Sequence, residues 1–338
     1  MKKVIVLNDT RSENHHGCSR VMNVIDLQLR KYGFEDVEYV PLGQDWSKSE
    51  NLKLIIIQSD ILIINGEGTI HDDSLLGLAL IQSAKFAYFH NVKCFLINAT
   101  FQNNKKIAYE DMKYFSLVSV RESNSHEELL KIKIHSEITP DLTFYFDNLL
   151  LKKGVEGDKY YTDNVCKEKT RILHKFGKDN KLIYSNIFNN NFVPPIDITK
   201  RLLMIFKNNS LFDLLAKIWV KFVKKNDNII ESVNTYDHIS YADHISNSSY
   251  ILCGRFHTVC YALNSLTPFQ AISSNTFKIE GLLNDIGLPL NKFMLSENRP
   301  EQINVNIGFS HDEVQSIMSF KKESKKKIDS LFGRILNE

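Results

Sequence analysis

The chain has 338 residues, of which 43% are hydrophobic and 24% are charged, values typical of soluble globular proteins. The formal net charge is only +2, which argues against a protein that coats nucleic acid. The five cysteines contain no CxxC pair, so they favour a reducing compartment over a disulfide framework. Because the chain begins with a strand-like run, we expect no signal peptide, and no apolar run reaches the ~18 residues that a membrane span needs. We therefore expect a cytoplasmic protein.

Short apolar runs alternate with segments of helical periodicity along the first half of the chain. Strands of four to six residues between longer helices are typical of a parallel sheet that is covered on both faces. The predicted strands are residues 3–7, 37–40, 60–64, 93–97 and 117–120, and the predicted helices are residues 18–31, 75–90, 105–115 and 124–131.

The same alternation restarts after a polar segment at residues 147–179. The predicted strands are residues 182–185, 250–253 and 268–272, and the predicted helices are residues 210–224, 238–246, 257–265 and 277–286. Two such series predict an α/β protein with two Rossmann-like domains, residues 1–150 and 175–338, which face each other across a cleft. A last helix at residues 321–336 is basic and amphipathic, so it is either a solvated helix or a peripheral contact with an anionic membrane surface, such as the inner face of the cytoplasmic membrane.

Ligands of open α/β sheets bind beyond the carboxyl ends of the strands, so the loops that follow the predicted strands carry the candidate site residues. The first such loop contains Asn14, His15, His16 and Gly17. The two histidines can hydrogen-bond sugar hydroxyls or a phosphate, unless the loop is simply polar and flexible. Adjacent histidines without a third ligand are a poor zinc signal, and we predict neither a metal nor a cofactor.

A glycine-rich turn follows the strand at residues 60–64. Gly66 and Gly68 flank Glu67, and His71 and Asp72 come next. A carboxylate at this position can take a proton from a sugar hydroxyl, which is the role of a general base. Alternatively, the acidic residues only cap the helix that begins near residue 74. The turn is not a P-loop, because it lacks the Lys-Ser/Thr pair.

Three further loops carry candidate anion ligands. Arg121 stands at the exit of one strand, where it binds an anion or else pairs with Glu122 or Glu127. In the second half, Gly254, Arg255, Phe256 and His257 follow the strand at 250–253. An arginine fork, a histidine that can donate a proton and a helix N-terminus favour the binding of a carboxylate or phosphate. The alternative is a capping histidine beside an ion-paired arginine.

Lys278 precedes another helix and could face the same anion, or be an ordinary lysine at a helix start.

Taken in order, these segments resemble the polysaccharide pyruvyl transferase family. The matching residues are Asn14 and Gly17, Gly66 and Gly68, Arg121 to Ser125, Pro140 and Asp141, Gly254 to His257, Lys278, and Asp285 to Leu288. The resemblance implies a fold similar to the two-domain glycosyltransferase B arrangement. It also implies transfer of pyruvate from phosphoenolpyruvate to two hydroxyls of a sugar, forming a ketal, during synthesis of a surface polysaccharide such as a capsule.

The resemblance further implies roles for single residues. Arg255 and His257 would hold phosphoenolpyruvate, with Arg121 as a second anion contact, and the N-terminal loops would hold the acceptor, free or lipid-linked. The chain departs from the family pattern where Glu67 interrupts a run of three glycines, where Glu122 replaces an aspartate, and where Cys18 replaces another aspartate. These departures fall in the acceptor half, so the acceptor or the reaction itself can differ.

The residues leave three hypotheses open. The first is pyruvyl transfer, with His257 as general acid and Glu67 as general base. The second is a glycosyltransferase, in which Arg255 and His257 hold the diphosphate of a nucleotide sugar. The third is a non-catalytic carbohydrate-binding protein. Gly254, Lys278 and Arg121 serve the donor in the first two, and Asn14, His15, His16, His71 and Asp72 serve the acceptor.

Overall fold

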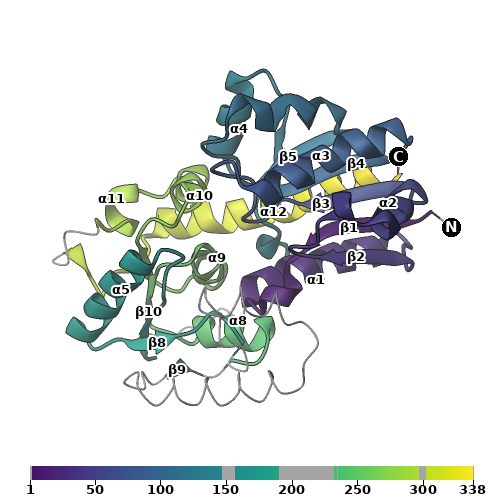
Figure 1. Cartoon of the computed structure of the whole chain (residues 1–338). Coiled ribbons are helices and arrows are strands. Elements are labelled where there is room, and N and C mark those ends of the chain that lie inside the picture. The colour runs from purple at the N-terminus through teal and green to yellow at the C-terminus, as the bar shows by residue number, and fades with distance from the viewer. Residues whose placement is uncertain (1, 147–156, 190–231, 234, 297–301, 338) are drawn as a thin grey trace, which may run out of the picture.

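The computed structural model describes residues 2–146, 157–189, 232–233, 235–296 and 302–337, and it shows two parallel β-sheets with helices packed around them (Figure 1). The first sheet has the order β2-β1-β3-β4-β5-β6. Its strands are β1 (Val4–Asp9), β2 (Val37–Pro41), β3 (Ile61–Asn65), β4 (Lys93–Ala99), β5 (Leu117–Val120) and β6 (Glu137–Ile138). Its helices are α1 (His16–Lys31), α2 (Glu50–Ile57), α3 (Leu75–Phe89) and α4 (Ser123–Lys131), with 3-10 turns η1 (Thr10–Glu13), η2 (Trp46–Lys48), η3 (Lys106–Tyr114) and η4 (Leu142–Tyr145).

Alternate residues of the central strands serve two separate cores, one on each face of this sheet. Ile5 and Leu62 belong to one cluster of buried side chains, whereas Val6 and Ile63 belong to another. Because neighbouring side chains of a strand point to opposite faces, a strand covered on both sides must be apolar throughout. Accordingly, the continuous apolar runs in the sequence mark the middle of the sheet.

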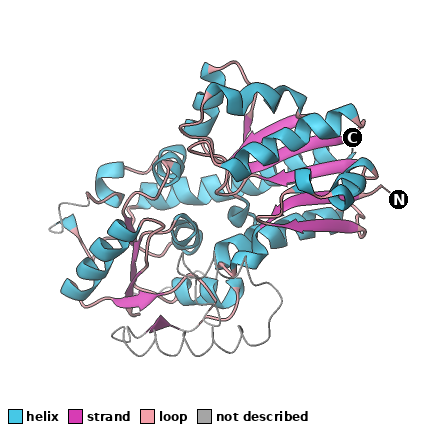
Figure 2. Ribbon diagram, in the orientation of Figure 1, coloured by secondary structure: helices cyan, strands magenta, loops and turns pink. Residues whose placement is uncertain are grey.

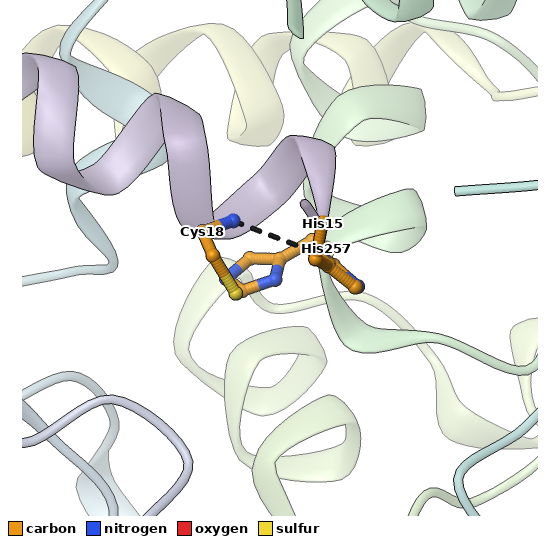
Figure 3. A group of neighbouring side chains, drawn as sticks. All are labelled: His15, Cys18 and His257. Atoms are coloured by element: carbon orange, nitrogen blue, oxygen red, sulfur yellow. Dashed lines mark hydrogen bonds between the residues drawn. The ribbon is translucent and has the colours of Figure 1, made fainter. Parts of the chain in front are cut away.

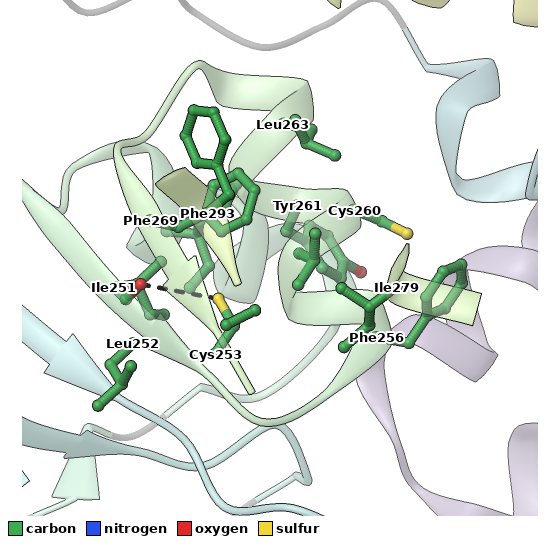
Figure 4. Close-up of a cluster of buried hydrophobic side chains, with 14 of the residues drawn as sticks. Ile251, Leu252, Cys253, Phe256, Cys260, Tyr261, Leu263, Phe269, Ile279 and Phe293 are labelled. Atoms are coloured by element: carbon green, nitrogen blue, oxygen red, sulfur yellow. Dashed lines mark hydrogen bonds between the residues drawn. The ribbon is translucent and has the colours of Figure 1, made fainter. Parts of the chain in front are cut away.

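The second sheet has the order β11-β10-β7-β8-β9, and all of its pairings are parallel. Its strands are β7 (Lys159–Tyr161), β8 (Ile183–Ser185), β9 (Ser232–Val233), β10 (Tyr250–Cys253) and β11 (Phe269–Ala271). Its helices are α5 (Lys167–Asp179), α8 (His238–Ser246), α9 (Phe256–Ser265), α10 (Lys278–Ile286) and α11 (Leu290–Phe293). Every residue of α9 is buried, and its Tyr261 lies in one core with Phe269 and Phe293 (Figure 4).

Helix α12 (His311–Asn337) joins the two halves of the molecule (Figure 1). Its C-terminal part, including Leu331 and Phe332, packs in the same core as Val4 and Val6 of the first sheet. Earlier in the helix, the buried Nζ of Lys321 donates a 2.7 Å hydrogen bond to the carbonyl of Asn264. Much of this helix is therefore packed against protein, and within the described residues no helix is long and apolar enough to cross a membrane.

Most predicted elements of the described residues are present, with boundaries that differ by a few positions (Figure 2). The elements not predicted from the sequence include α2, whose apolar run merges with the following strand, and β7 and α5, which lie within the polar segment at 147–179. The short elements β6, β9 and α11 were not predicted either. The N-terminal part of α12, from residue 311, was also missed. The helix predicted at 210–224 lies outside the described residues.

Candidate functional site

A cavity of about 360 Å³ lies where the carboxyl ends of strands from both sheets meet. The loops that follow β1, β3 and β5 contribute from the first sheet, and those that follow β7, β10 and β11 contribute from the second. The lining residues used below are Thr10, His15, Cys18, Glu67, Arg121, Arg255, His257 and Lys278. A larger hollow of about 790 Å³ lies beside η3 and β5, but its lining residues all come from residues 104–135 of the first half, so the second sheet does not contribute to it.

Glu67 and His257 meet across the cavity from opposite sheets. Nε2 of His257 lies 3.1 Å from Oε1 of Glu67, and both side chains are almost fully buried. The two atoms are too poorly aligned for a hydrogen bond, and neither has another hydrogen-bond partner among the described residues. The other carboxylate oxygen of Glu67 accepts a 2.9 Å hydrogen bond from Thr10. This leaves one oxygen of Glu67 directed at the imidazole.

Asp141, which does not line the cavity, contacts both Arg121 and His257. Its Oδ2 lies 3.0 Å from Nη1 of Arg121 and 3.7 Å from Nε2 of His257. Burial opposes its ionisation, but the proximity of His257 and the charge of Arg121 prevail and hold the pKa of Asp141 well below its ordinary value. Nε of Arg121 donates to Thr100, and its guanidinium stacks 4.5 Å from the ring centre of Phe256. The side chain of Arg121 is thus fixed, and its partner is Asp141 rather than Glu122 or Glu127.

Arg255 is oriented by a carboxylate of the second sheet. Nε donates a 2.8 Å hydrogen bond to Oδ1 of Asp163, and Nη2 donates to Oδ2, which makes a bidentate pair. Burial lowers the pKa of Arg255, but the hydrogen bond and charge of Asp163 outweigh it, and the pKa is raised overall. The arginine is therefore ion-paired and also lines the cavity.

Lys278 is a buried cation at the start of α10. Its side chain is 7% exposed, and Nζ donates a 2.8 Å hydrogen bond to Oδ1 of Asn275. No carboxylate of the described residues forms an ion pair with it. Burial, followed by the charges of Arg121 and Arg255, lowers its pKa to about 7. A cation in this position gains most from an anion that enters the cavity.

His15, Cys18 and His257 form a group of metal-binding side chains (Figure 3). Each offers one ligand atom, and these atoms lie within 4.8 Å of one another. The sequence predicts no metal ligands here, because it shows only the adjacent His15 and His16. The helix α1 turns Cys18 towards His15, and the fold brings His257 from the other sheet. Cysteine and histidine are the residue types that bind Zn²⁺ in proteins.

Helix α1 comes very close to α9 at this point. A Cβ atom on Gly17 would lie 2.1 Å from Cγ of His257, so only glycine allows the approach. The helix begins at His16, and its cap is the imidazole of His15, whose Nδ1 accepts from the backbone N–H groups of Gly17 and Cys18. Burial first, then the charges of His257 and Arg255, lower the pKa of His15 well below its ordinary value.

Four of the residues predicted to bind the acceptor do not line the cavity. Asn14 is exposed in a left-handed turn, and His16 contacts Thr235 and stacks on Tyr241. His71 contacts Asn275 and Asp72, and Asp72 accepts from Asn103. Gly254 is also outside the lining, where its N–H donates to Thr162. The cap of α3 is Ser74, not an aspartate.

Sequence reasoning missed Asp163, Cys18 and Thr10 as residues of this cavity or its support. Asp163 falls in the polar segment that was interpreted as an interdomain connection, and only its position after the short strand β7 indicated a site. Cys18 was noted solely as a departure from the family pattern. Asp141 was part of the quoted Pro-Asp pair, but no role was assigned to it.

The fold and the cavity define a class of protein: a two-domain α/β enzyme of the glycosyltransferase B arrangement with a cationic site between the sheets. A UDP-GlcNAc 2-epimerase from Methanocaldococcus jannaschii, solved with UDP-GlcNAc and UDP, is 14% identical with a TM-score of 0.52, covering 100% of this chain and 99% of that one. A putative UDP-N-acetylglucosamine 2-epimerase from Listeria monocytogenes is 11% identical with a TM-score of 0.51, and the match covers 97% of this chain and 91% of that one. These similarities show the fold alone.

The family follows from the sequence. The profile of the family described as polysaccharide pyruvyl transferase matches residues 23–276, and the chain belongs to that family. Comparison with curated proteins gives no match. Family membership makes the protein a transferase.

Proposed function

We propose that the protein transfers pyruvate from phosphoenolpyruvate to two hydroxyls of a saccharide during surface-polysaccharide synthesis. The observation that carries this proposal is the convergence of Arg121, Arg255 and Lys278 on one small cavity that also contains the His257–Glu67 contact. Phosphoenolpyruvate carries a phosphate and a carboxylate on a small molecule. The cavity lies near the lower end of the roughly 300–1,000 Å³ range of ligand pockets, which favours a small donor.

Two helix N-termini add to the attraction for the donor. Helix α9 begins next to Arg255 and α10 begins at Lys278, and no side chain of the described residues caps either one. Their first N–H groups and the positive ends of their dipoles are thus available to an anion. Arg255, oriented by Asp163, offers a planar fork for one anionic group, and Lys278 supplies a compact charge for the other.

The chemistry requires proton transfers, which we assign to Glu67 and His257. Glu67 accepts the proton of an acceptor hydroxyl while that oxygen bonds to C2 of phosphoenolpyruvate and the methylene carbon takes up a proton to become a methyl group. His257 supplies the proton of the first step. A second hydroxyl then bonds to C2, its proton passes through His257 to the departing phosphate, the C2–O bond to phosphate breaks, and phosphate leaves with the electron pair of that bond.

Thermal shift with the full chain tests donor identity, because a ligand of the native state raises the melting temperature. We expect a shift with phosphoenolpyruvate that is lost in Arg255→Ala, and no shift with a panel of nucleotide sugars. His257→Ala should retain the fold and abolish turnover. A shift with nucleotide sugars alone would overturn the proposal.

The second candidate is a glycosyltransferase that uses a nucleotide sugar. It is supported by the same cationic cavity and by a fold shared with a protein solved with UDP-GlcNAc, and it would show the reverse pattern of thermal shifts. For either candidate function, a screen of free and lipid-linked saccharides would identify the acceptor.

A further inference from the structure

We propose that His15, Cys18, His257 and Glu67 bind one Zn²⁺ ion and that the bound ion stops the transfer. The binding half of this proposal stands on the geometry of the four residues. The inhibition half rests on the proposed function, because it concerns the same His257–Glu67 contact.

Three of the four side chains lie close enough together to share one small cation, and Glu67 lies outside this group of three but in contact with His257. The ligand atoms of His15, Cys18 and His257 lie within 4.8 Å of one another, and Oε1 of Glu67 is 3.1 Å from Nε2 of His257. In a tetrahedral site with bonds of about 2.0–2.1 Å, nitrogen and oxygen ligands are roughly 3.3 Å apart. The His257–Glu67 pair therefore already has the separation of two zinc ligands, and metal binding requires His15 and Cys18 to close in around the ion from their present spacing.

Two buried atoms of this group lack a partner. Oε1 of Glu67 and Nε2 of His257 form no hydrogen bond with any described residue, although both side chains are more than nine-tenths buried. Leaving such groups without a hydrogen bond in a protein interior destabilises the folded state. A cation between them would satisfy both at once.

The charge of the ligand set matches the ion. A thiolate from Cys18 and the carboxylate of Glu67 supply two negative charges, which balance Zn²⁺. The complex as a whole is then neutral, so the nearby Arg255 and Lys278 do not exclude it. The sequence separation also fits a closed site, because His15 and Cys18 lie on one turn at the start of α1 while the other two ligands come from different loops.

His15 must give up one interaction to bind. Its Nδ1 accepts from the N–H groups of Gly17 and Cys18, at 3.1 and 3.4 Å, so in this tautomer Nε2 carries the proton and the metal would bind at Nδ1. Loss of a single helix cap destabilises a protein far less than a bound zinc ion stabilises a structural zinc site.

Occupancy has a direct consequence for the proposed chemistry. Zinc would use the lone pair of His257 and one of Glu67, which are the same lone pairs that exchange protons with donor and acceptor. The anion site formed by Arg255 and Lys278 would remain open. We therefore expect zinc to abolish turnover without abolishing donor binding.

Metal titration of the chelator-treated full chain tests the site. We expect one Zn²⁺ per chain by calorimetry and, with Co²⁺ as the probe, a thiolate-to-metal charge-transfer band. Cys18→Ser should lose the band and weaken binding by about 100-fold or more, since even outer-sphere changes cost 10- to 100-fold. Cys166→Ser is the matched control, because Cys166 is a partly buried free cysteine at the start of α5, outside the cavity lining, and should behave as the parent chain.

A second variant keeps the test decisive if Cys18→Ser unfolds. Glu67→Gln preserves the shape of the site and should also weaken Zn²⁺ binding at least tenfold. The proposed zinc site would be overturned if the parent chain showed no Co²⁺ band. It would also be overturned if Cys18→Ser and Glu67→Gln both bound Zn²⁺ as tightly as the parent chain. Turnover that is unchanged at saturating zinc would overturn the inhibition. Phosphoenolpyruvate binding is measured separately in the presence of chelator. Failure of the proposed function can therefore be distinguished from failure of the zinc site.

Discussion

Nε2 of His257 approaches Oε1 of Glu67 to 3.1 Å, and this contact connects the loop after β3 in the first sheet with the start of α9 in the second. Neither sheet alone contains both residues. The proposed proton transfers therefore depend on how the two sheets are held together, which α1 and α12 accomplish through contacts with both halves.

If Glu67 and His257 act as one unit, their substitutions should not be additive. We expect Glu67→Gln and His257→Asn each to lower kcat by about 10²–10⁴, the usual contribution of a positioned acid or base. The double variant should be little worse than the poorer single variant. Phosphate release from phosphoenolpyruvate in the presence of acceptor measures this, with melting temperatures as the fold control. Fully additive losses would show that the two residues act independently.

Donor affinity should fall as pH rises through the pKa of Lys278. Burial and the neighbouring arginines lower this pKa to about 7, so the free site loses its ammonium charge above neutrality. A bound anion favours the protonated form, and binding is therefore accompanied by proton uptake at pH 8. Calorimetry of phosphoenolpyruvate in buffers of different ionisation enthalpy detects the uptake.

Lys278→Arg stays charged across this range and is the matched variant for that experiment. Its donor affinity should be nearly constant from pH 6 to pH 9. A parent chain with equal affinity at both ends of the range would exclude Lys278 from the anion site.

Asp163 should act on donor binding through Arg255. Asp163→Asn removes a charge-assisted bidentate pair, and hydrogen bonds to charged groups contribute about 1.5–3 kcal/mol. We expect donor affinity to drop roughly tenfold or more, with kcat less affected, because the arginine loses its orientation but keeps its charge. An increase in donor affinity would indicate that Asp163 competes with the donor for Arg255 instead of positioning it.

Gly17→Ala should damage the site by a purely steric route. The added Cβ would lie 2.1 Å from Cγ of His257, so helix α1 or the imidazole must move. Overpacking of this kind costs about 1–3 kcal/mol of unfolding free energy, and turnover should be lost as His257 shifts. Gly308→Ala, where the new Cβ atom meets nothing within 4 Å, should leave the unfolding free energy and the turnover unchanged. Chemical denaturation and turnover assays measure the two effects.

Glu122 should make the protein less stable as pH rises. Burial raises its pKa to about 7 against 4.5 in an unfolded chain. The folded state therefore holds a proton that the unfolded state has released, and this stabilisation is complete below pH 4.5 and lost as pH passes 7. Glu122→Gln should be more stable than the parent at pH 8, by about 2–3 kcal/mol, and differ little at pH 5. Denaturation at the two pH values checks it.

Several features could be predicted from local sequence alone. The continuous apolar runs around Ile63 and Leu252 identified the central strands, because a strand that is covered on both faces must be apolar at every position. The polar residues directly after those strands, Glu67, Arg255 and His257, then indicated the candidate site, since the carboxyl ends of parallel strands meet at one edge.

Tertiary structure decided the partners of those residues. That Arg121 pairs with Asp141, that Arg255 pairs with Asp163, and that His257 meets Glu67, His15 and Cys18 all depend on the relative placement of the two sheets. Hydrophobic periodicity reports only which face of each element is buried, and it carries no information about which element covers that face. For the same reason the basic helix at the C-terminus was interpreted as solvated or membrane-bound, whereas its apolar stripe packs against the first sheet.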